Sequence, residues 1–375
     1  MNTPALMNHF AAVDDPRREQ GKRHLLADML TLTICAIVSG ANNWVEIEEY
    51  GESKREWLGG FLALPHGIPS HDTLSEVFAR LDPTQLEAGF QSWVSSIAAQ
   101  VEGVAIQIDG KVVRGSGDKY TGQAPLHLVS AWVGSLQLLL GQVKTADKSN
   151  EITAIPALLK LLTLEGSLVT IDAMGTQTEI AAQIVEQGGD YVLAVKQNHK
   201  TVFDDLHDLF AGCDTVQFEE VAHDYAQTVN KGHGRIETRR CWTLSDPAYL
   251  AYLRRRSEWA KLATVIRLER QRQVEGHVSQ EVVYFLSSRT ASAAFFLDVI
   301  RQHWSIENQL HWSLDVTFRE DHNQTSVGHA SLNLALLRRL VLLLLKRETS
   351  VKVGLQAKRM RAGWNNDYLL NVLSN

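Results

Sequence analysis

The chain has 375 residues, of which 45% are hydrophobic and 21% charged, so it can build a large core in about two domains and is not disordered throughout. Its formal net charge of −6 excludes a uniformly basic nucleic-acid-binding surface but leaves room for local basic patches. Its three cysteines lie far apart without a CxxC pair, which argues against a disulfide framework or a cysteine zinc site and favours a reducing, cytoplasmic setting.

Neither the N-terminus nor the most apolar segment has the character of a membrane-inserted sequence. Residues 1–26 contain no signal-peptide hydrophobic region. Residues 334–345 are strongly apolar, but they are interrupted by Arg338 and Arg339 and are too short to span a bilayer. This stretch therefore predicts a buried helix.

The first hundred residues predict a helical domain, which we place at residues 1–99. Apolar-rich and amphipathic patterns predict helices at 25–38, 43–58 and 83–99. Thr73 and Glu76 form a capping-box pattern that predicts the start of a further short helix. Helices joined by turns are compatible with DNA binding, but they are also the commonest way to build any helical domain.

From residue 101 the pattern changes to strands alternating with helices. The predicted order up to residue 198 is β, β, β, α, β, α, β, with a hairpin turn at Gly134-Ser135 and an Asp-Gly turn ending the first strand. This order predicts an α/β fold, a mixed sheet with helices on its faces.

The rest of the chain completes this second domain. Charged strand-forming segments predict a β-rich insertion at about 212–288, and helices are expected at 291–314 and 331–349. We therefore place the sheet domain at residues 100–350 and a basic C-terminal tail at 351–375.

Two aspartates follow hydrophobic strands. Asp109 lies in "IQIDGK" and Asp172 in "VTIDAMG", and each precedes a turn glycine. Ligands gather at such strand ends, although aspartate before a turn also occurs without any function. The stretch between them fits a hairpin and one crossover, so we expect the two carboxylates side by side on neighbouring strands.

A glutamate interrupts an apolar helix pattern further along. At about 100° per residue, Glu307 falls near the centre of a stripe about 120° wide; the other members of the stripe are Ile300, His303, Trp304, Leu310, His311 and Leu314. A buried, unpaired carboxylate costs several kcal/mol or becomes neutral, so a basic side chain or a metal ion should meet it.

Three converging carboxylates favour divalent metal binding. Asp109, Asp172 and Glu307 would repel one another without cations between them, and a pair of Mg²⁺ or Mn²⁺ ions suits carboxylate oxygens. Such an ion pair is suited to phosphoryl transfer. A histidine-based zinc site on the same helix is disfavoured because no HExxH sequence occurs.

These motifs together resemble the DDE transposases of bacterial insertion sequences, most closely the H-repeat-associated group. The resemblance rests on "IDGK", "IDAMGTQ", "YVLAVKQNH" and "HWSIENQLHWSLDVTFRED", and it covers nearly the whole chain. It implies an RNase H-like core, divalent-metal catalysis, and DNA cleavage followed by joining of the freed 3′-OH to target DNA. It also implies double-stranded DNA as the partner and a homodimer on DNA.

The resemblance assigns the three acids to Asp109, Asp172 and Glu307, as catalytic residues and metal ligands. The wider superfamily carries Tyr, Arg and Lys at the positions that are Ile300, His303 and Leu314 here. This departure matches the His-Trp-x-Ile-Glu-Asn form of the H-repeat group. Alternative third acids are Asp315, Glu320 and Asp321.

Further residues are candidate DNA contacts. Lys111 and Arg114 follow Asp109 and could instead lie in a solvated turn. His303 would contact a phosphate when protonated. The candidates are Lys111, Arg114, Lys196, Asn198, His303 and His311. Trp304 is expected in the core, whereas Trp312 is a candidate for base stacking.

Two basic clusters are expected either on solvated helix faces or against DNA phosphates. One lies in the insertion, at Arg254, Arg255 and Arg256. The other lies near the C-terminus and comprises Arg338, Arg339, Lys346, Arg347, Lys352, Lys358, Arg359 and Arg361.

Two other functions remain open beside a transposase. One is an RNase H-like nuclease that cuts without strand transfer. The other is a decayed or domesticated protein that only binds DNA, which the three intact acids argue against.

Overall fold

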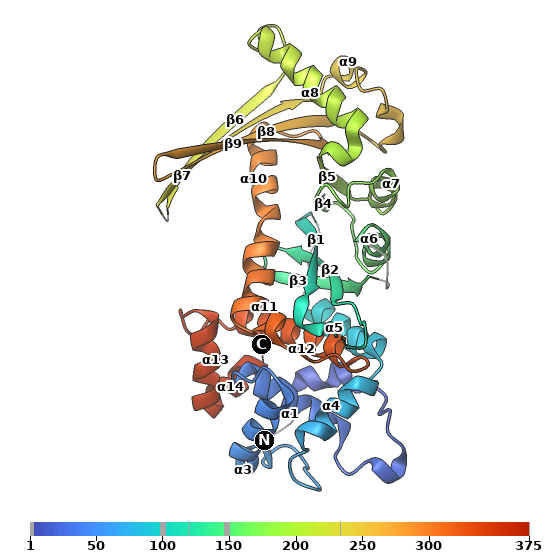
Figure 1. Ribbon diagram of the computed structural model, residues 1–375, viewed down its shortest axis with the longest axis vertical. Coiled ribbons are helices and arrows are strands. Elements are labelled where there is room, and N and C mark those ends of the chain that lie inside the picture. The colour runs from blue at the N-terminus through green and yellow to red at the C-terminus, as the bar shows by residue number, and fades with distance from the viewer. Residues whose placement is uncertain (1–3, 98–102, 119, 146–150, 233, 375) are drawn as a thin grey trace.

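The computed structural model describes residues 4–97, 103–118, 120–145, 151–232 and 234–374. The molecule is elongated (Figure 1), with a helical body at one end, a sheet in the middle and an arm of long strands at the other end. Both chain termini lie in the helical body. The predicted boundary between residues 99 and 100 lies outside the described residues.

The helical body is built from both ends of the chain. Helices α12 to α14 pack against α1, and α12 also contacts α4 and α5. The N-terminal helices are α1 (Leu26–Val38), α2 (Trp44–Ser53), α3 (Arg55–Leu58), α4 (His71–Arg80) and α5 (Pro83–Ile97), and the C-terminal ones are α12 (Ala330–Arg347), α13 (Leu355–Trp364) and α14 (Asn366–Leu373). The stretch predicted as a basic tail therefore folds as two helices on this body.

Helix α4 begins three residues earlier than the capping-box pattern predicted. The side chain of Ser70 accepts a hydrogen bond from the backbone N–H of Thr73, so Ser70 is the N-cap. Thr73 instead lies inside the helix. The predicted capping role of Thr73 is therefore wrong.

One mixed sheet of nine strands runs through the middle of the molecule and the arm, in the order β3-β2-β1-β4-β5-β9-β8-β7-β6. Strands β1, β4 and β5 are parallel, and the other neighbours are antiparallel. The strands are β1 (Ala105–Val113), β2 (Leu126–Val133), β3 (Leu138–Lys144), β4 (Leu168–Ile171), β5 (Asp190–Val195), β6 (Asp224–Gly232), β7 (Arg235–Leu244), β8 (Thr264–Val274) and β9 (His277–Ser287).

Helices cover both faces of this sheet. Side chains alternate along β5, so Val192 and Ala194 join the core under α10 while Leu193 and Val195 join the core under the helices of the other face. The helix on one face is α10 (Ala293–His303), and those on the other are α6 (Glu151–Leu159), α7 (Thr178–Glu186) and α8 (Lys200–Thr215). A short helix, α9 (Pro247–Leu250), lies between β7 and β8 in the chain.

The β-rich segment after α8 continues the same sheet. Strand β9 pairs with β5, and β8, β7 and β6 follow outward, forming what we call the arm. The sequence predicted β7, β8 and β9 but missed β6, because its side chains are exposed or only half-buried and show no apolar alternation.

The first strand does not end at the Asp-Gly pair. Strand β1 continues through Asp109 and Gly110 to Val113, and Gly110 pairs with Val129 of β2. The predicted turn is therefore wrong. The hairpin joining β2 to β3 at Gly134 is confirmed, and so is the prediction that β1 and β4 are neighbours; the two strands are parallel.

The helix predicted at 291–314 is interrupted. Helix α10 ends at His303, a π-helical turn follows at Ile306–His311, and α11 (Trp312–Val316) continues the path. The extra residue of a π turn rotates the helical residues after it, so a wheel at 100° per residue fails here. Glu307 is exposed and Trp304 is 47% exposed, which contradicts the predicted burial of both.

Half of the C-terminal basic cluster is buried in the helical body. Arg338, Arg339, Lys358 and Arg359 are all less than a tenth exposed. Arg339 pairs with Glu320 at 2.7 Å, and Arg359 donates to backbone carbonyls. For these four cations, both the solvated-face and the DNA-contact predictions are wrong.

Among the described residues, no helix is both long and apolar enough to cross a membrane.

Candidate active site

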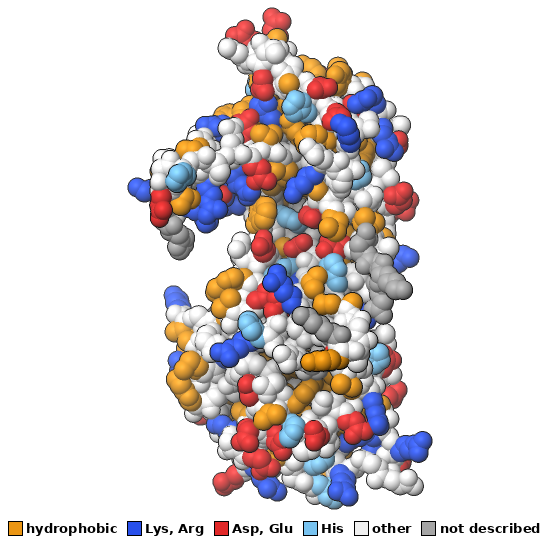
Figure 2. Space-filling model, viewed as in Figure 1, with side chains coloured by type: hydrophobic (Ala, Val, Ile, Leu, Met, Phe, Trp, Pro, Cys, Tyr) orange, Lys and Arg blue, Asp and Glu red, His pale blue; other side chains and the backbone are white. Residues whose placement is uncertain are grey.

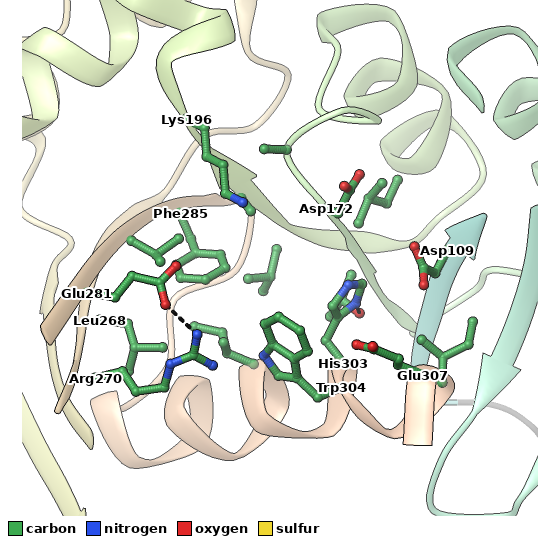
Figure 3. A pocket seen from close by; sticks show the side chains of 18 residues that line it. Asp109, Asp172, Lys196, Leu268, Arg270, Glu281, Phe285, His303, Trp304 and Glu307 are labelled. Atoms are coloured by element: carbon green, nitrogen blue, oxygen red, sulfur yellow. Dashed lines mark hydrogen bonds and ion pairs between the residues drawn. The ribbon is translucent and has the colours of Figure 1, made fainter. Parts of the chain in front are cut away.

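A pocket of about 220 Å³ lies between the sheet and α10. Asp109, Asp172 and Glu307 lie at one end of it, and Arg270 and Glu281 of the arm lie at the other (Figure 3). The pocket therefore brings together the three acids singled out in the sequence, which lie up to 198 positions apart in the chain.

The two aspartates are neighbours because of strand register. Ile108 of β1 and Ile171 of β4 are partners in the parallel ladder, and each is followed by one of the aspartates. Oδ1 of Asp172 also accepts hydrogen bonds from the backbone N–H groups of Met174 and Gly175, at 3.0 and 3.1 Å. Asp172 therefore fixes the turn after β4 as well as lining the pocket.

The surroundings of Asp109 disfavour the charged form of its carboxyl group. Burial raises its pKa to about 7, and the nearby carboxylates of Glu151, Asp172 and Glu307 act in the same direction. A cation between these groups would relieve that repulsion.

Glu151 is a fourth acid that sequence reasoning missed. It opens α6 beside β1, and its Oε1 lies 3.0 Å from Nε2 of His127. Burial and the charge of Asp172 raise its pKa. A Cβ on Gly110 would come within 2.1 Å of Oε1 of Glu151, so the glycine after Asp109 makes room for this acid and is not a turn residue.

Glu307 is carried on the π-helical turn. π turns are frequent at functional sites because the additional residue re-aims a side chain. Here the turn leaves Ile306 and Leu310 buried while Glu307 reaches the pocket. The π-helical turn thus accounts for the exposed position of Glu307.

The two histidines do not have the roles that the sequence predicted. Burial lowers the pKa of His303 to about 4, and its Nδ1 lies 2.8 Å from Oγ1 of Thr170. Burial lowers the pKa of His311 to about 3, and its Nδ1 lies 3.5 Å from Oδ2 of Asp109. Both rings are therefore neutral near pH 7, which contradicts the predicted protonated contact of His303. A direct DNA contact by either neutral ring stays a prediction.

Lys111 is also unavailable to DNA. Its Nζ lies 2.6 Å from Asp315 and 3.3 Å from Asp321, and the residue is 7% exposed. Its predicted phosphate contact is wrong because the ammonium group holds β1 to the segment after α11. Asp315 and Asp321, two of the alternatives to Glu307, are thus paired with Lys111. The remaining alternative, Glu320, is fully buried against Arg339.

Three of the predicted contacts remain on the surface. Lys196 follows β5, is exposed and lines the pocket. Asn198 is exposed, but its side-chain amide donates to the carbonyl of Ala173 at 2.6 Å and so ties two strand ends together. Arg114 is exposed outside the pocket lining, near Asp321.

The oxygen ligands in the pocket suit Mg²⁺ or Mn²⁺, and the repulsion at Asp109 favours a cation there. However, no group of three His, Cys, Asp or Glu side chains among the described residues is arranged to hold a metal ion. The donor types therefore fit a hard divalent cation, whereas the ligand sphere is not closed.

Comparison with known proteins decides the family. The "Transposase DDE domain" model matches residues 102–344, and the "DDE_Tnp_1-associated" model matches residues 7–94. The chain belongs to the DDE transposase family. Within the family it is similar to the H-repeat group.

Two relatives of this transposase illustrate that similarity. "Putative transposase YncI" of Escherichia coli O157:H7 is 36% identical over 379 residues, which is 100% of this chain and 95% of the relative. "H repeat-associated putative transposase YhhI" of Escherichia coli K12 is 34% identical over 378 residues, 100% of this chain and 99% of the relative.

A solved structure, a piggyBac transposase synaptic complex with hairpin DNA, overlaps the transposase loosely. Its TM-score is 0.43 at 9% identity, with 94% of this chain and 75% of that chain covered. A likeness at this level does not define the fold.

Proposed function

We propose that this transposase binds the ends of an insertion sequence, cuts the DNA there with the help of divalent cations, and joins the freed 3′-OH to target DNA. The observation that carries the proposal is the convergence of Asp109, Asp172 and Glu307 on one pocket, with burial and mutual repulsion raising the pKa of Asp109 to about 7. The strand order β3-β2-β1-β4-β5, with the last three strands parallel, supports an RNase H-like core.

In this proposal the three acids are the metal ligands and catalytic residues. A bound Mg²⁺ or Mn²⁺ would lower the pKa of an attacking water and stabilise the departing 3′-oxygen. Asp172 is held by two backbone N–H groups, and Asp109 by the ladder of β1. Lys196 holds a phosphate at the pocket rim, and Arg114 contacts the backbone further away.

The same proposal includes a homodimer on double-stranded DNA, because transposition joins two ends. We assign residues 1–99 to a helical, DNA-binding domain and residues 100–350 to the catalytic domain with its insertion. Residues 351–375 form the C-terminal segment.

The test is an incubation with Mg²⁺ and a DNA fragment carrying the inverted repeats that flank the gene. In Asp172→Asn, the amide oxygen keeps the turn hydrogen bonds but loses the charge, so we expect cleavage to fall by on the order of 10³-fold or more while DNA binding persists. Glu179→Gln on α7, exposed and outside the pocket, is the matched control.

Resolving the products at nucleotide length separates the alternatives. Cutting at a repeat end followed by 3′-OH joining, lost only in Asp172→Asn, supports the proposal. Cutting without joining indicates the nuclease. DNA binding without cutting, equal in wild type and variant, indicates a protein that only binds DNA and contradicts the catalytic proposal.

A further inference from the structure

A second hollow, which we call the arm groove, lies beside the acidic pocket. It encloses about 830 Å³ between the inner face of β6–β9 and the segment around α10 and the π-helical turn. It shares Arg270, Glu281 and Trp304 with the acidic pocket, so the two hollows are continuous. In Figure 2, Lys and Arg side chains gather under the arm, above the open side of the molecule.

The arm groove is basic although the chain is acidic overall. Two acids line it, and both are paired: Glu237 with Arg239 at 2.7 Å, and Glu281 with Arg270 across β8 and β9. The lining cations are Lys231, Arg235, Arg239, Arg270, Arg272 and Arg301. Cations thus outnumber acids six to two in the groove, against a net charge of −6 for the whole chain.

Four of these cations are unpaired. Where the structure describes the chain, Lys231, Arg235, Arg272 and Arg301 form no ion pair, and all four are exposed. The opposite face of the same strands also carries arginines, but there Arg267 pairs with Asp214 and Arg240 with Glu269. By strand register, Lys231 shares its face with Ile236 and so lies at the edge of the groove. The groove cations without an ion-pair partner in the described chain are therefore Arg235 and Arg272 on the strands and Arg301 on α10.

We propose that the arm groove binds the sugar–phosphate backbone of the same DNA whose scissile phosphate lies in the acidic pocket. A polyanion with regularly repeated charges matches cations spread along β7, β8 and α10. The continuity of the hollows places the groove beside the phosphate that lies at the acids. We assign the groove to the DNA end being cut because cutting precedes joining, so this DNA reaches the acids first. This inference rests on the proposed function for the position of the scissile phosphate.

Trp304 marks the passage between the two hollows. Its ring is 47% exposed, and the guanidinium carbon of Arg270 lies 5.3 Å from the ring centroid. A strand leaving the acids toward the arm passes this indole and then the unpaired cations.

The experiment measures DNA affinity against salt in the Asp172→Asn background, so that cleavage does not interfere. The probes are a labelled duplex carrying the inverted repeat with its flank, and an unrelated duplex of equal length. The groove variant is Arg272→Ala/Arg301→Ala. The control is Arg255→Ala/Arg256→Ala, which removes two charges from the segment between β7 and β8, outside the groove, where Arg255 is paired with Glu258.

Each phosphate contact contributes about 0.9 to the slope of log affinity against log salt, so the groove variant should lose a slope of about 2 on the repeat duplex. Between about 50 and about 200 mM salt, its loss of affinity should therefore be roughly tenfold smaller than that of the parent. The control should keep the parental slope, and thermal melting should be the same for all three proteins.

Equal slopes for the groove and control variants overturn the inference, as does a slope change confined to the unrelated duplex. Cleavage by the wild-type protein in Mg²⁺ is scored separately. A groove-specific slope change without any wild-type cleavage supports the groove and overturns the catalytic proposal. Wild-type cleavage without a groove-specific slope change does the reverse.

Discussion

The C-terminal helices and the arm are both rich in lysine and arginine, but the fold uses their charges differently. In the helical body, Arg359 donates to the carbonyls of Ile37 and Ala41, and Arg339 pairs with Glu320. In the arm groove, Arg272 and Arg301 face solvent with no acid paired to them within the described chain. The first set holds distant segments together, and the second is free to meet an external anion.

Clustering in the sequence is therefore a poor guide to where cations act. For two of the buried cations the partners come from far along the chain: the carbonyl of Asn42 lies 296 positions from Arg338, and that of Ile37 lies 322 positions from Arg359. In the arm, by contrast, strand alternation puts every second side chain on one face, so the unpaired Arg235 and Arg272 share the groove face with the paired Arg239 and Arg270.

The largest effect is expected when a buried cation is removed from its partner. Arg339→Met leaves Glu320 buried without a cation, which should cost about 3–5 kcal/mol in the free energy of unfolding. Urea denaturation measures it. The salt slope of DNA binding by the folded fraction should stay unchanged.

The double variant Arg339→Met/Glu320→Leu is the control for this loss. It removes both charges and should recover most of the stability, because a well-packed apolar pair replaces a buried ion pair at little cost. A single variant as stable as wild type would show that the buried cations are not structural and would undo the contrast with the arm.

A smaller effect is expected at a half-buried acid that has no ion pair among the described residues. Burial raises the pKa of Glu87 to about 7, and its side-chain partners are Gln91 at 3.1 Å and Gln142 at 3.5 Å. Because its folded pKa is above the unfolded value, the protein loses stability as pH rises from about 4.5 to 7.

Glu87→Gln removes that charge, so it should stabilise the protein at pH 8 by about 2–3 kcal/mol and leave it nearly unchanged at about pH 4.5. Thermal or urea unfolding at the two pH values measures the difference. Glu179→Gln, on an exposed helix face, is the reference and should show no such pH dependence. A stabilisation equal at both pH values would refute the titration of Glu87.

The smallest stability effect is predicted for the arm itself. Lys231→Ala/Arg235→Ala should change the free energy of unfolding by no more than about 0.5 kcal/mol, because neither cation has an ion-pair partner in the described chain to lose. The same urea series measures it. A destabilisation comparable with that of Arg339→Met would show that the arm cations are structural as well.

Much of the fold around the site could be predicted from the sequence. Buried strands such as β4 and β5 are continuous apolar runs, and the parallel pairing of β1 with β4 follows from the crossover between them. Strand β6 could not be found because it is the outermost strand of the sheet. Its side chains are exposed or half-buried and so show no apolar alternation. The π-helical turn could not be found because periodicity arguments assume a regular helix.

The site was partly predictable for similar reasons. Asp109 and Asp172 were found from recognisable strands. Glu307 was singled out on a helical wheel and then assigned by the family resemblance, although its predicted burial was wrong. Glu151 was missed and Lys111 was misassigned because the partner of each lies on a different element of the fold. His127, the partner of Glu151, lies on β2, and Asp315 lies 204 positions from Lys111. A glycine packed against Glu151 looked like a turn residue, since a missing side chain has the same sequence signature in both cases.

The arm is hydrogen-bonded to the core through β5 and β9, within one continuous sheet. This pairing ties it to the strands that carry the aspartates, so it cannot swing independently of them while the ladder is intact. The register of the ladder therefore fixes the separation between the two aspartates at β1 and β4 and the unpaired arginines of β7 and β8, Arg235 and Arg272. Any DNA that occupies both places would be measured from its cut end, so the protein would protect a stretch of fixed offset whatever the base sequence.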